Sequence, residues 1–220
     1  TVVESAEIHD KIVDIREATG KPVYVSMGGV AASGGYYISA PADVIFANPG
    51  TMTGSLGVIM EAINYRELAD KLGIEFETIK SGPYKDIGSP NREMSEDERN
   101  ILQTMIDNSY EQFVDVIASG RNLSESRVKE IADGRIYDGI QAKELGLVDE
   151  LGSFDDTIAA IRTEIGDEQA PVIQYEQNFG FNSFLQLTAQ KLFGPETDLL
   201  GIKQLISESN TPRLMYLYTE

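Results

Sequence analysis

The sequence contains no cysteine and only one histidine, His9, among its 220 residues. Disulfides, thiolate nucleophiles and thiolate metal sites are therefore excluded, and so is a histidine-rich metal centre. The absence of cysteine is compatible with an exported protein without demonstrating export. We expect neither a metal ion nor another cofactor.

Long apolar runs are absent as well. No segment approaches the roughly 18 to 20 apolar residues of a membrane-spanning helix, and no signal-peptide pattern opens the chain. The sequence starts at Thr1 and passes almost at once into a helical pattern. We interpret it as a fragment or a processed form, which leaves a membrane anchor upstream as an open alternative.

Basic residues are few, because 18 lysines and arginines stand against 36 aspartates and glutamates, for a net charge of −18. Lysine and arginine supply the attraction to phosphate groups, so this balance argues against binding to nucleic acid or directly to an anionic membrane surface. With 41% hydrophobic residues, the chain can bury the core of one domain, with or without an appendage.

What is present is an alternation of strand and helix patterns. The predicted helices cover residues 1–20, 35–40, 64–73, 95–119, 124–134, 140–146 and 154–166. The predicted strands cover residues 22–27, 43–49, the end of 50–60, 74–80, 135–139 and 147–151. Strands joined by crossover helices indicate an α/β domain with a mainly parallel sheet. We assign this domain to residues 1–170, with its first strands missing upstream, and the less regular residues 171–220 to a C-terminal appendage.

The stretch "AASGG" carries the first candidate for chemistry, Ser33. It follows a predicted strand and a turn of small residues, and it opens a predicted helix. Such a turn can expose a serine hydroxyl, while free N–H groups at the helix start can stabilise an oxyanion. The stretch departs from the G-x-S-x-G nucleophile motif at its first glycine. The residues alone therefore leave open both close packing of helix on strand and an accessible nucleophile.

A serine nucleophile needs a base, and His9 is a poor candidate. It lies in an amphipathic helix beside Asp10 and Lys11, so we interpret it as a surface or half-buried structural residue. A lysine base must be neutral, although free lysine titrates near ~10.4 and a useful base near ~7 to 8. Lys85 is a candidate because its loop has few long side chains, but Asp86 would favour its charged form if the two faced each other. A loop lysine taken alone is more often a solvated charge.

Three stretches together resemble a known family: "SMGGVAASGGYYISAPADVIFANPGTMTGSLGVI", "FETIKSGPYKDIGSP" and "DGRIYDGIQAKELGLVDELG". They are similar to the signal peptide peptidase A family of bacterial membrane-bound Ser-Lys proteases, in its short Gram-positive form. The resemblance covers nearly the whole chain. It implies a Clp-protease/crotonase-like α/β fold and a serine peptidase without a metal.

The resemblance also implies roles for individual residues. Ser33 is then the nucleophile and Lys85 the general base, whereas Lys80 at the start of the K-S-G-x-x-K motif is not. Ser55, in the T-G-S-x-G motif, orients the lysine, and a hydroxyl suits that task because it does not favour the charged amine as a carboxylate would.

The resemblance further implies an oxyanion and substrate site beside Ser33. The N–H of Gly34 is the first oxyanion donor, and Gly29 and Val30 contribute to binding of oxyanion and substrate. Family members carry a second donor in an upstream N-S-P-G-G segment, which this sequence does not contain.

The expected substrates are residual signal peptides and other apolar peptides, bound in an extended conformation. The family implies a single-pass anchor upstream, a catalytic domain at the extracytoplasmic membrane face, and a ring-like homo-oligomer with active sites near protomer interfaces. In such rings the serine and the lysine can come from neighbouring protomers. The alternatives are a crotonase-like acyl-CoA enzyme, which shares the fold, and a non-catalytic scaffold of membrane complexes.

Three further features receive structural interpretations. Tyr36 and Tyr37 are expected to pack their helix against the core. The acidic residues 96–98 are expected to supply favourable charge at a helix N-terminus. The apolar tail 212–220 is interpreted as an edge strand or an oligomer contact, and occupation of a peptide cleft is its alternative.

Overall fold

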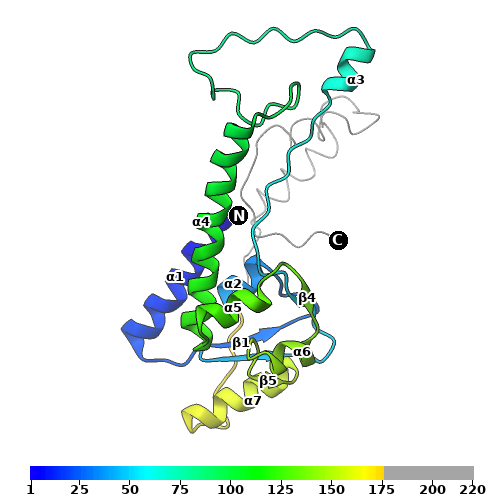
Figure 1. Ribbon diagram of the computed structural model, residues 1–220. Helices are drawn as coiled ribbons and strands as arrows, with labels where there is room; N and C mark the ends of the chain where they lie inside the picture. Colours follow the sequence, from blue (N-terminus) through cyan, green and yellow to red (C-terminus); the bar gives the residue numbers. More distant parts are fainter. Residues whose placement is uncertain (176–220) are drawn as a thin grey trace, which may run out of the picture. The chain divides into compact units, whose positions relative to one another are not determined.

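The computed structural model describes residues 1–175 and contains a central sheet of three parallel strands (Figure 1). In chain order, the strands of the described residues are β1 (Tyr24–Met27), β2 (Val44–Ala47), β3 (Thr53–Gly54), β4 (Ile136–Tyr137) and β5 (Glu150–Leu151). The sheet order is β1-β2-β5, and both pairings are parallel. β3 and β4 form a separate antiparallel pair. An α/β fold with a parallel sheet is confirmed.

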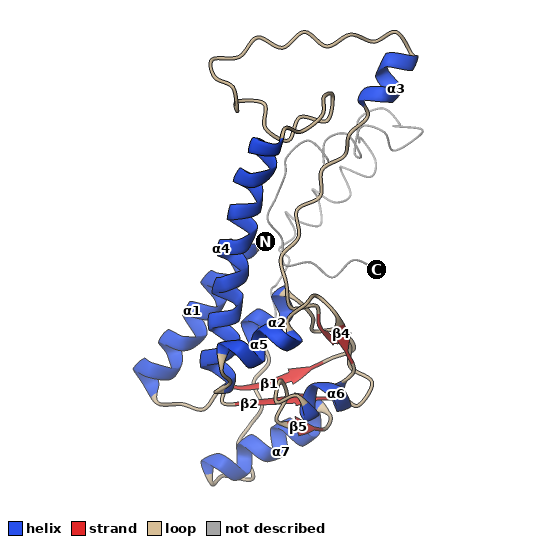
Figure 2. Cartoon of the chain, viewed as in Figure 1, coloured by secondary structure: helices blue, strands red, loops and turns tan. Residues whose placement is uncertain are grey.

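Helices make up most of the remaining regular structure (Figure 2). They are α1 (Val2–Thr19), α2 (Gly34–Ser39), α3 (Arg66–Lys71), α4 (Glu96–Arg121), α5 (Glu125–Ile131), α6 (Gly139–Glu144) and α7 (Phe154–Ile165). All of them belong to the unit formed by residues 1–168, in which α1 packs on α2, α5 on α4, and α7 on β1. None of the helices within residues 1–175 combines the length and the apolar character that crossing a bilayer requires.

Local capping signals set several helix ends. Ser95 begins α4 with a capping box, in which its side chain accepts from the Glu98 N–H and the Glu98 side chain accepts from the Ser95 N–H. Gly20 ends α1 at φ 63°, a left-handed conformation that glycine adopts without strain. These ends agree with the sequence-based predictions because the signals act within four residues.

The core joins α2, α4 and the sheet. Tyr36 is fully buried and Tyr37 is 4% exposed, as predicted, and the ring of Tyr37 lies 5.1 Å from that of Phe113 on α4. α4 also approaches the end of α2 closely at Gly120, where a Cβ would lie 2.2 Å from the carbonyl oxygen of Ala40. The turn that carries Ser33 is thus held against the middle and the end of α4.

One predicted strand is absent. Residues 74–80 form no strand, and the exposure of Ile74, Phe76 and Ile79 shows that their alternating pattern finds no buried face. A strand needs a partner as well as a pattern. The helix predicted over 64–73 is present as α3, Arg66–Lys71; Tyr65 is its N-cap, and the side chain of Asn64 accepts from the Arg66 N–H just before it.

The appendage predicted at 171–220 lies largely outside the described residues, and the tail 212–220 lies wholly outside them. The boundary at residue 170 stays a prediction.

Candidate active site

Ser33 stands between the small-residue turn and the first residue of α2, in a backbone conformation that is rare for a residue with a side chain. Its φ of 54° and ψ of −114° mirror the extended conformation of ordinary residues. Glycine enters this region readily, whereas other residues are strained there. The fold must therefore hold Ser33 in this conformation through other contacts.

The side chain of Ser33 is buried, with 1% of the residue exposed, and its Oγ has no hydrogen-bond partner among the described residues. It does not cap α2 either. The sequence left open a packed and an accessible Ser33, and the structure encloses its hydroxyl; the N–H of Ser33 is bonded to Gly54 of β3. Buried polar groups are nearly always paired, so an unpaired serine Oγ is a sign of function.

β3 brings the backbone of Ser33 next to Ser55. The N–H of Ser33 donates to the carbonyl of Gly54 at 2.8 Å, and the N–H of Ser55 donates to the carbonyl of Arg135 at 2.7 Å. Ser55 also has a positive φ, of 49°. Within residues 1–175, Asn122 is the one other non-glycine residue with positive φ, and it caps α4 in a conformation that asparagine tolerates. Two predicted site residues thus share the remaining backbone strain.

Gly29 and Val30 form a short extended segment beside Met52. The N–H of Met52 donates to the carbonyl of Gly29 at 2.8 Å, and the N–H of Ala31 donates to the carbonyl of Met52 at 2.9 Å. In this parallel pairing the N–H and carbonyl of Val30 point to the opposite edge. The Val30 side chain is exposed, and its N–H and carbonyl make no backbone hydrogen bond within residues 1–175. The N–H of Gly34, at the first position of α2, donates no hydrogen bond within residues 1–175.

Thr51 and Thr53 support this segment, and the sequence analysis missed both. The Thr51 hydroxyl donates to the carbonyl of Gly28 at 2.8 Å, and that of Thr53 donates to the carbonyl of Ala31 at 2.7 Å. Both threonines are buried. Their spacing of two in "GTMTGS" was the available signal, because alternate residues of an extended segment point to the same face.

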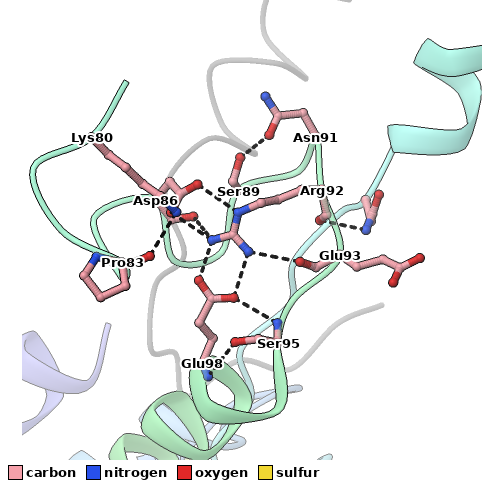
Figure 3. A network of polar contacts seen from close by, with 10 residues as sticks. Lys80, Pro83, Asp86, Ser89, Asn91, Arg92, Glu93, Ser95 and Glu98 are labelled. Atoms are coloured by element: carbon pink, nitrogen blue, oxygen red, sulfur yellow. Dashed lines mark hydrogen bonds and ion pairs between the residues drawn. The ribbon is translucent and has the colours of Figure 1, made fainter. Parts of the chain in front are cut away.

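Lys85 lies on an exposed turn before α4, and its ammonium group has no partner among the described residues. Its neighbour Asp86 is engaged elsewhere (Figure 3). Arg92 donates to its two carboxylate oxygens at 2.8 and 2.9 Å, and Lys80 donates to one of them at 2.6 Å. Hydrogen bonds from Arg92, then Lys80, hold the pKa of Asp86 well below its usual range.

One copy of the chain does not bring Lys85 to Ser33. The Lys85 turn is joined through Arg92 to Glu98 in the first turn of α4, whereas α2 contacts α4 through Tyr37 and Phe113. At a rise of 1.5 Å per residue, the helix separates Glu98 from Phe113 by about 22 Å. Figure 2 shows the loop before α4 at the far end of this helix from α2. Ser55 does approach Ser33, but Lys85 does not.

Ser55 opens instead onto a pocket of about 600 Å³. Its wall comes from residues 55–59, from α4 and from residues 132–136, and it includes Tyr110 and Ile136. Within residues 1–175, Asp107 and Asp133 are the charged residues of this wall, and the Asp133 carboxylate is already paired with Arg135. Asp107 accepts a hydrogen bond from the Gln103 amide and has no cationic partner within residues 1–175.

His9 has the structural role that was predicted. Its side chain is half-buried, its Nδ1 lies 2.9 Å from a carboxylate oxygen of Asp10, and its ring meets the ring of Tyr37 edge-on at 5.5 Å. No group of three or more metal-binding side chains is found within residues 1–175.

Two relatives match nearly all of this chain. "Putative signal peptide peptidase SppA" from Enterococcus faecium is 42% identical over 223 residues, which cover 99% of this chain and 64% of that protein. "Putative protease slr0021" from Synechocystis sp. is 43% identical over 225 residues, which cover 98% of this chain and 80% of that protein. The chain thus spans less than two thirds of the length of the first relative.

Solved structures overlap the chain less closely. An enoyl-CoA hydratase/isomerase from Marinobacter aquaeolei is 14% identical, with a TM-score of 0.40 and coverage of 93% of this chain and 64% of that chain. A ClpP1 mutant from Listeria monocytogenes is also 14% identical, with a TM-score of 0.38 and coverage of 71% of this chain and 88% of that chain. Because these TM-scores are low, family membership rests on the sequence.

The decisive match extends over most of the described fold. Residues 15–166 match the peptidase family S49, and this range contains Ser33, Ser55 and Lys85. The chain therefore belongs to peptidase family S49, a family of serine peptidases.

Proposed function

We propose that this protein is a serine endopeptidase in which Ser33 is the nucleophile and Lys85 the general base. Two observations at Ser33 carry the proposal. Its buried Oγ has no partner among the described residues, and its backbone is strained. A buried unpaired hydroxyl and a strained conformation both lower stability, so their coincidence at one serine supports a functional role. Family membership favours this peptidase over the acyl-CoA enzyme and the scaffold.

The reaction is an acyl transfer. Neutral Lys85 takes the proton of the Ser33 hydroxyl while Oγ attacks the peptide carbonyl carbon, and the carbonyl electron pair moves onto oxygen. The Gly34 N–H donates to this oxyanion. When the tetrahedral intermediate collapses, the C–N bond breaks and the lysine gives its proton to the leaving amine. Water, deprotonated by the lysine, then hydrolyses the acyl-enzyme and regenerates Ser33.

The substrate is an extended apolar peptide. It would add to the open edge at Gly29 and Val30, because the N–H and carbonyl of Val30 are directed there and can pair with a peptide backbone. The exposed Val30 side chain offers apolar contact. Residual signal peptides fit this chemistry, and the proposed site of action is the extracytoplasmic membrane face, with an anchor upstream. The catalytic domain is assigned to residues 1–170 and the appendage to 171–220.

Two copies of the chain complete the dyad, in a ring-like homo-oligomer. The exposed Lys85, which has no partner among the described residues, and the pocket beside Ser55 support this arrangement. Lys85 of a second copy would enter the pocket and meet the Ser55 hydroxyl, which orients the amine towards Ser33.

Labelling with a serine-directed fluorophosphonate tests the nucleophile. The full-length protein should be labelled, and Ser33→Ala should not; labelling that survives Ser33→Ala would exclude Ser33. Lys85→Ala should abolish peptide cleavage, and activity of the wild type should rise with alkaline pH as the base loses its proton.

Mixing the two inactive variants tests the shared dyad. Ser33→Ala and Lys85→Ala subunits, unfolded together and reassembled, should recover part of the wild-type activity, because an intact serine then meets an intact lysine across the interface. Each variant reassembled alone is the control. Full inactivity of the mixed oligomer would show that serine and lysine act within one copy.

A further inference from the structure

Four charged side chains join the Lys85 turn to the start of α4: Lys80, Asp86, Arg92 and Glu98 (Figure 3). None of them has a role in the acyl transfer described above. Arg92 lies at the centre of this cluster, between the other charges of the turn and the carboxylate on the helix.

The guanidinium of Arg92 binds two carboxylates at once. Nε and Nη2 donate to the two oxygens of Asp86, at 2.8 and 2.9 Å. Nη1 donates to one oxygen of Glu98 at 2.8 Å, and Nη2 donates to the other. Further bonds of 3.0 Å run to the backbone carbonyls of Asp86 and Glu93. Planar two-pronged pairing of this kind fixes orientation as well as distance, and a lysine cannot reproduce it.

Glu98 fixes one end of the cluster to α4. Its residue is 2% exposed, and the same carboxylate accepts from the Ser95 N–H at 2.9 Å in the capping box of α4. Hydrogen bonds from Arg92 and from the Ser95 backbone lower the pKa of Glu98 to about 2. The acidic start of α4 therefore does more than favour the helix dipole, because it fastens Arg92 to the helix.

At its other end, the cluster holds the turn that presents Lys85. Backbone N–H groups of Lys85, Ile87 and Ser89 donate to carbonyls three residues back, at 3.3, 3.1 and 3.0 Å. Asp86, the only acid of this turn, faces Arg92 and Lys80, and Lys80 also donates to the carbonyl of Pro83 at 3.0 Å. Lys85 is left exposed beside an acid that is already paired.

We propose that Arg92 is a positioning residue for the general base. By donating hydrogen bonds to both Asp86 and Glu98, it fixes the turn that carries Lys85 to the capped start of α4. The same bonds keep the Asp86 carboxylate away from Lys85. This inference rests on the proposed function, because it takes Lys85 as the base. Arg92 itself touches neither substrate nor Ser33.

Hydrogen exchange tests the anchor without any reference to catalysis. In Asp86→Asn the Arg92–Glu98 pair survives, so the fold should persist while the amides of Lys85, Ile87 and Ser89 exchange roughly 10-fold faster. Arg92→Met should have a larger effect at the same amides. Arg127→Met is the matched control, because Arg127 makes an exposed pair with Glu130 on α5. Unchanged exchange at the turn in Asp86→Asn and Arg92→Met would refute the anchor.

Peptide-cleavage kinetics of the full-length protein test the positioning. Arg92→Met should lower kcat roughly 10- to 100-fold with little change in KM, because the base is misplaced while the peptide site is intact. The midpoint of the alkaline rise in rate should move up by about one pH unit, because Asp86, then held by Lys80 alone, can turn towards Lys85 and favour its charged form. Arg92→Lys should recover little of the rate, since a lysine cannot hold both carboxylates.

The double variant Arg92→Met/Asp86→Asn separates the two effects. Its kcat should remain low because the anchor is absent, but its pH midpoint should return towards the wild-type value because the acid is gone. If Arg92→Met only reduced the amount of folded protein, the rate would fall without any shift in the pH midpoint. A wild-type midpoint in Arg92→Met would therefore contradict the proposal.

Failure of this inference is distinguishable from failure of the proposed function. If the wild type cleaves peptides and loses fluorophosphonate labelling in Ser33→Ala, while Arg92→Met has wild-type kinetics, only the role of Arg92 is refuted. If the wild type is neither labelled nor active, the proposed function fails, and with it the role of Arg92 in catalysis.

Discussion

The N–H of Ser33 donates a 2.8 Å hydrogen bond to the carbonyl of Gly54, the residue that precedes Ser55. This one bond joins the turn before α2 to β3 and holds Ser33 in its mirrored conformation. It also sets the two serines of the site side by side, although 22 positions separate them along the chain. The stability of the site therefore depends on residues that take no part in the reaction.

Ser33→Ala should make the protein more stable while abolishing labelling. The substitution removes a buried hydroxyl that has no partner, and we expect a gain of about 1 kcal/mol in the free energy of unfolding. Ser33→Gly should gain a further amount of roughly 1 kcal/mol, because glycine adopts φ 54° and ψ −114° without strain. Urea unfolding measures both. A loss of stability in Ser33→Ala would mean that the hydroxyl has a partner.

Gly54→Ala should destabilise the site. A Cβ at this position would lie 2.7 Å from the ring of Tyr137 and 2.8 Å from the carbonyl of Arg135, and φ is +80°. We expect a loss of more than about 2 kcal/mol, together with slower labelling of Ser33. Gly166→Ala is the matched control, since φ is +70° there but nothing lies within 4 Å. Equal losses in the two variants would show that strain alone, without the clash, accounts for the effect.

Tyr36→Phe should cost about 1–3 kcal/mol in the free energy of unfolding. The Tyr36 hydroxyl donates to the carbonyl of Leu147 at 2.8 Å in the core, and its removal leaves that carbonyl unpaired. Burial raises the pKa of Tyr36, which keeps the hydroxyl as a donor. Tyr24→Phe is the control, because it preserves the stacking of this ring on Phe46. Thermal unfolding should separate the two variants clearly, and similar melting temperatures would argue against the buried bond.

Glu98→Gln should flatten the acid limb of the stability curve. The pKa of Glu98 is lowered from 4.5 to about 2, first by hydrogen bonds from Arg92 and then by the Ser95 backbone. A depressed pKa in the folded state means that the ionised group stabilises the protein above about pH 4.5. This contribution is lost as the pH falls from 4.5 towards 2. Urea midpoints measured from pH 6 to pH 2 should fall more steeply for the wild type than for Glu98→Gln.

Much of the local structure was predictable from the sequence. The helix caps were predictable, namely the capping box of Ser95 and Glu98 and the terminating Gly20, because each forms within one helical turn. The helices after residue 123 were also predicted. In each cap, the two residues that form the hydrogen bond lie only a few positions apart in the sequence. The family motifs around Ser33, Ser55 and Lys85 were recognisable for a different reason, because each combines several unusual residues at fixed spacing.

The failures have one physical cause. Residues 74–80 have the alternation of a strand, but a strand exists only through a partner, and alternation does not supply one. The threonines that support Gly28 and Ala31 were missed because each acts on a segment more than 20 residues earlier in the chain.

By itself, the sequence determined the elements and the chemical groups: an α/β chain with caps at its helix ends, a serine in a turn of small residues, and a lysine in a polar loop. Only the tertiary structure decided how these groups meet. It gives Ser33 its mirrored backbone through Gly54, pairs Asp86 with Arg92 and Lys80, and separates Lys85 from Ser33 along α4. Helix caps are local bonds, whereas the geometry of a site is set by contacts between segments whose distance in space no spacing in sequence encodes.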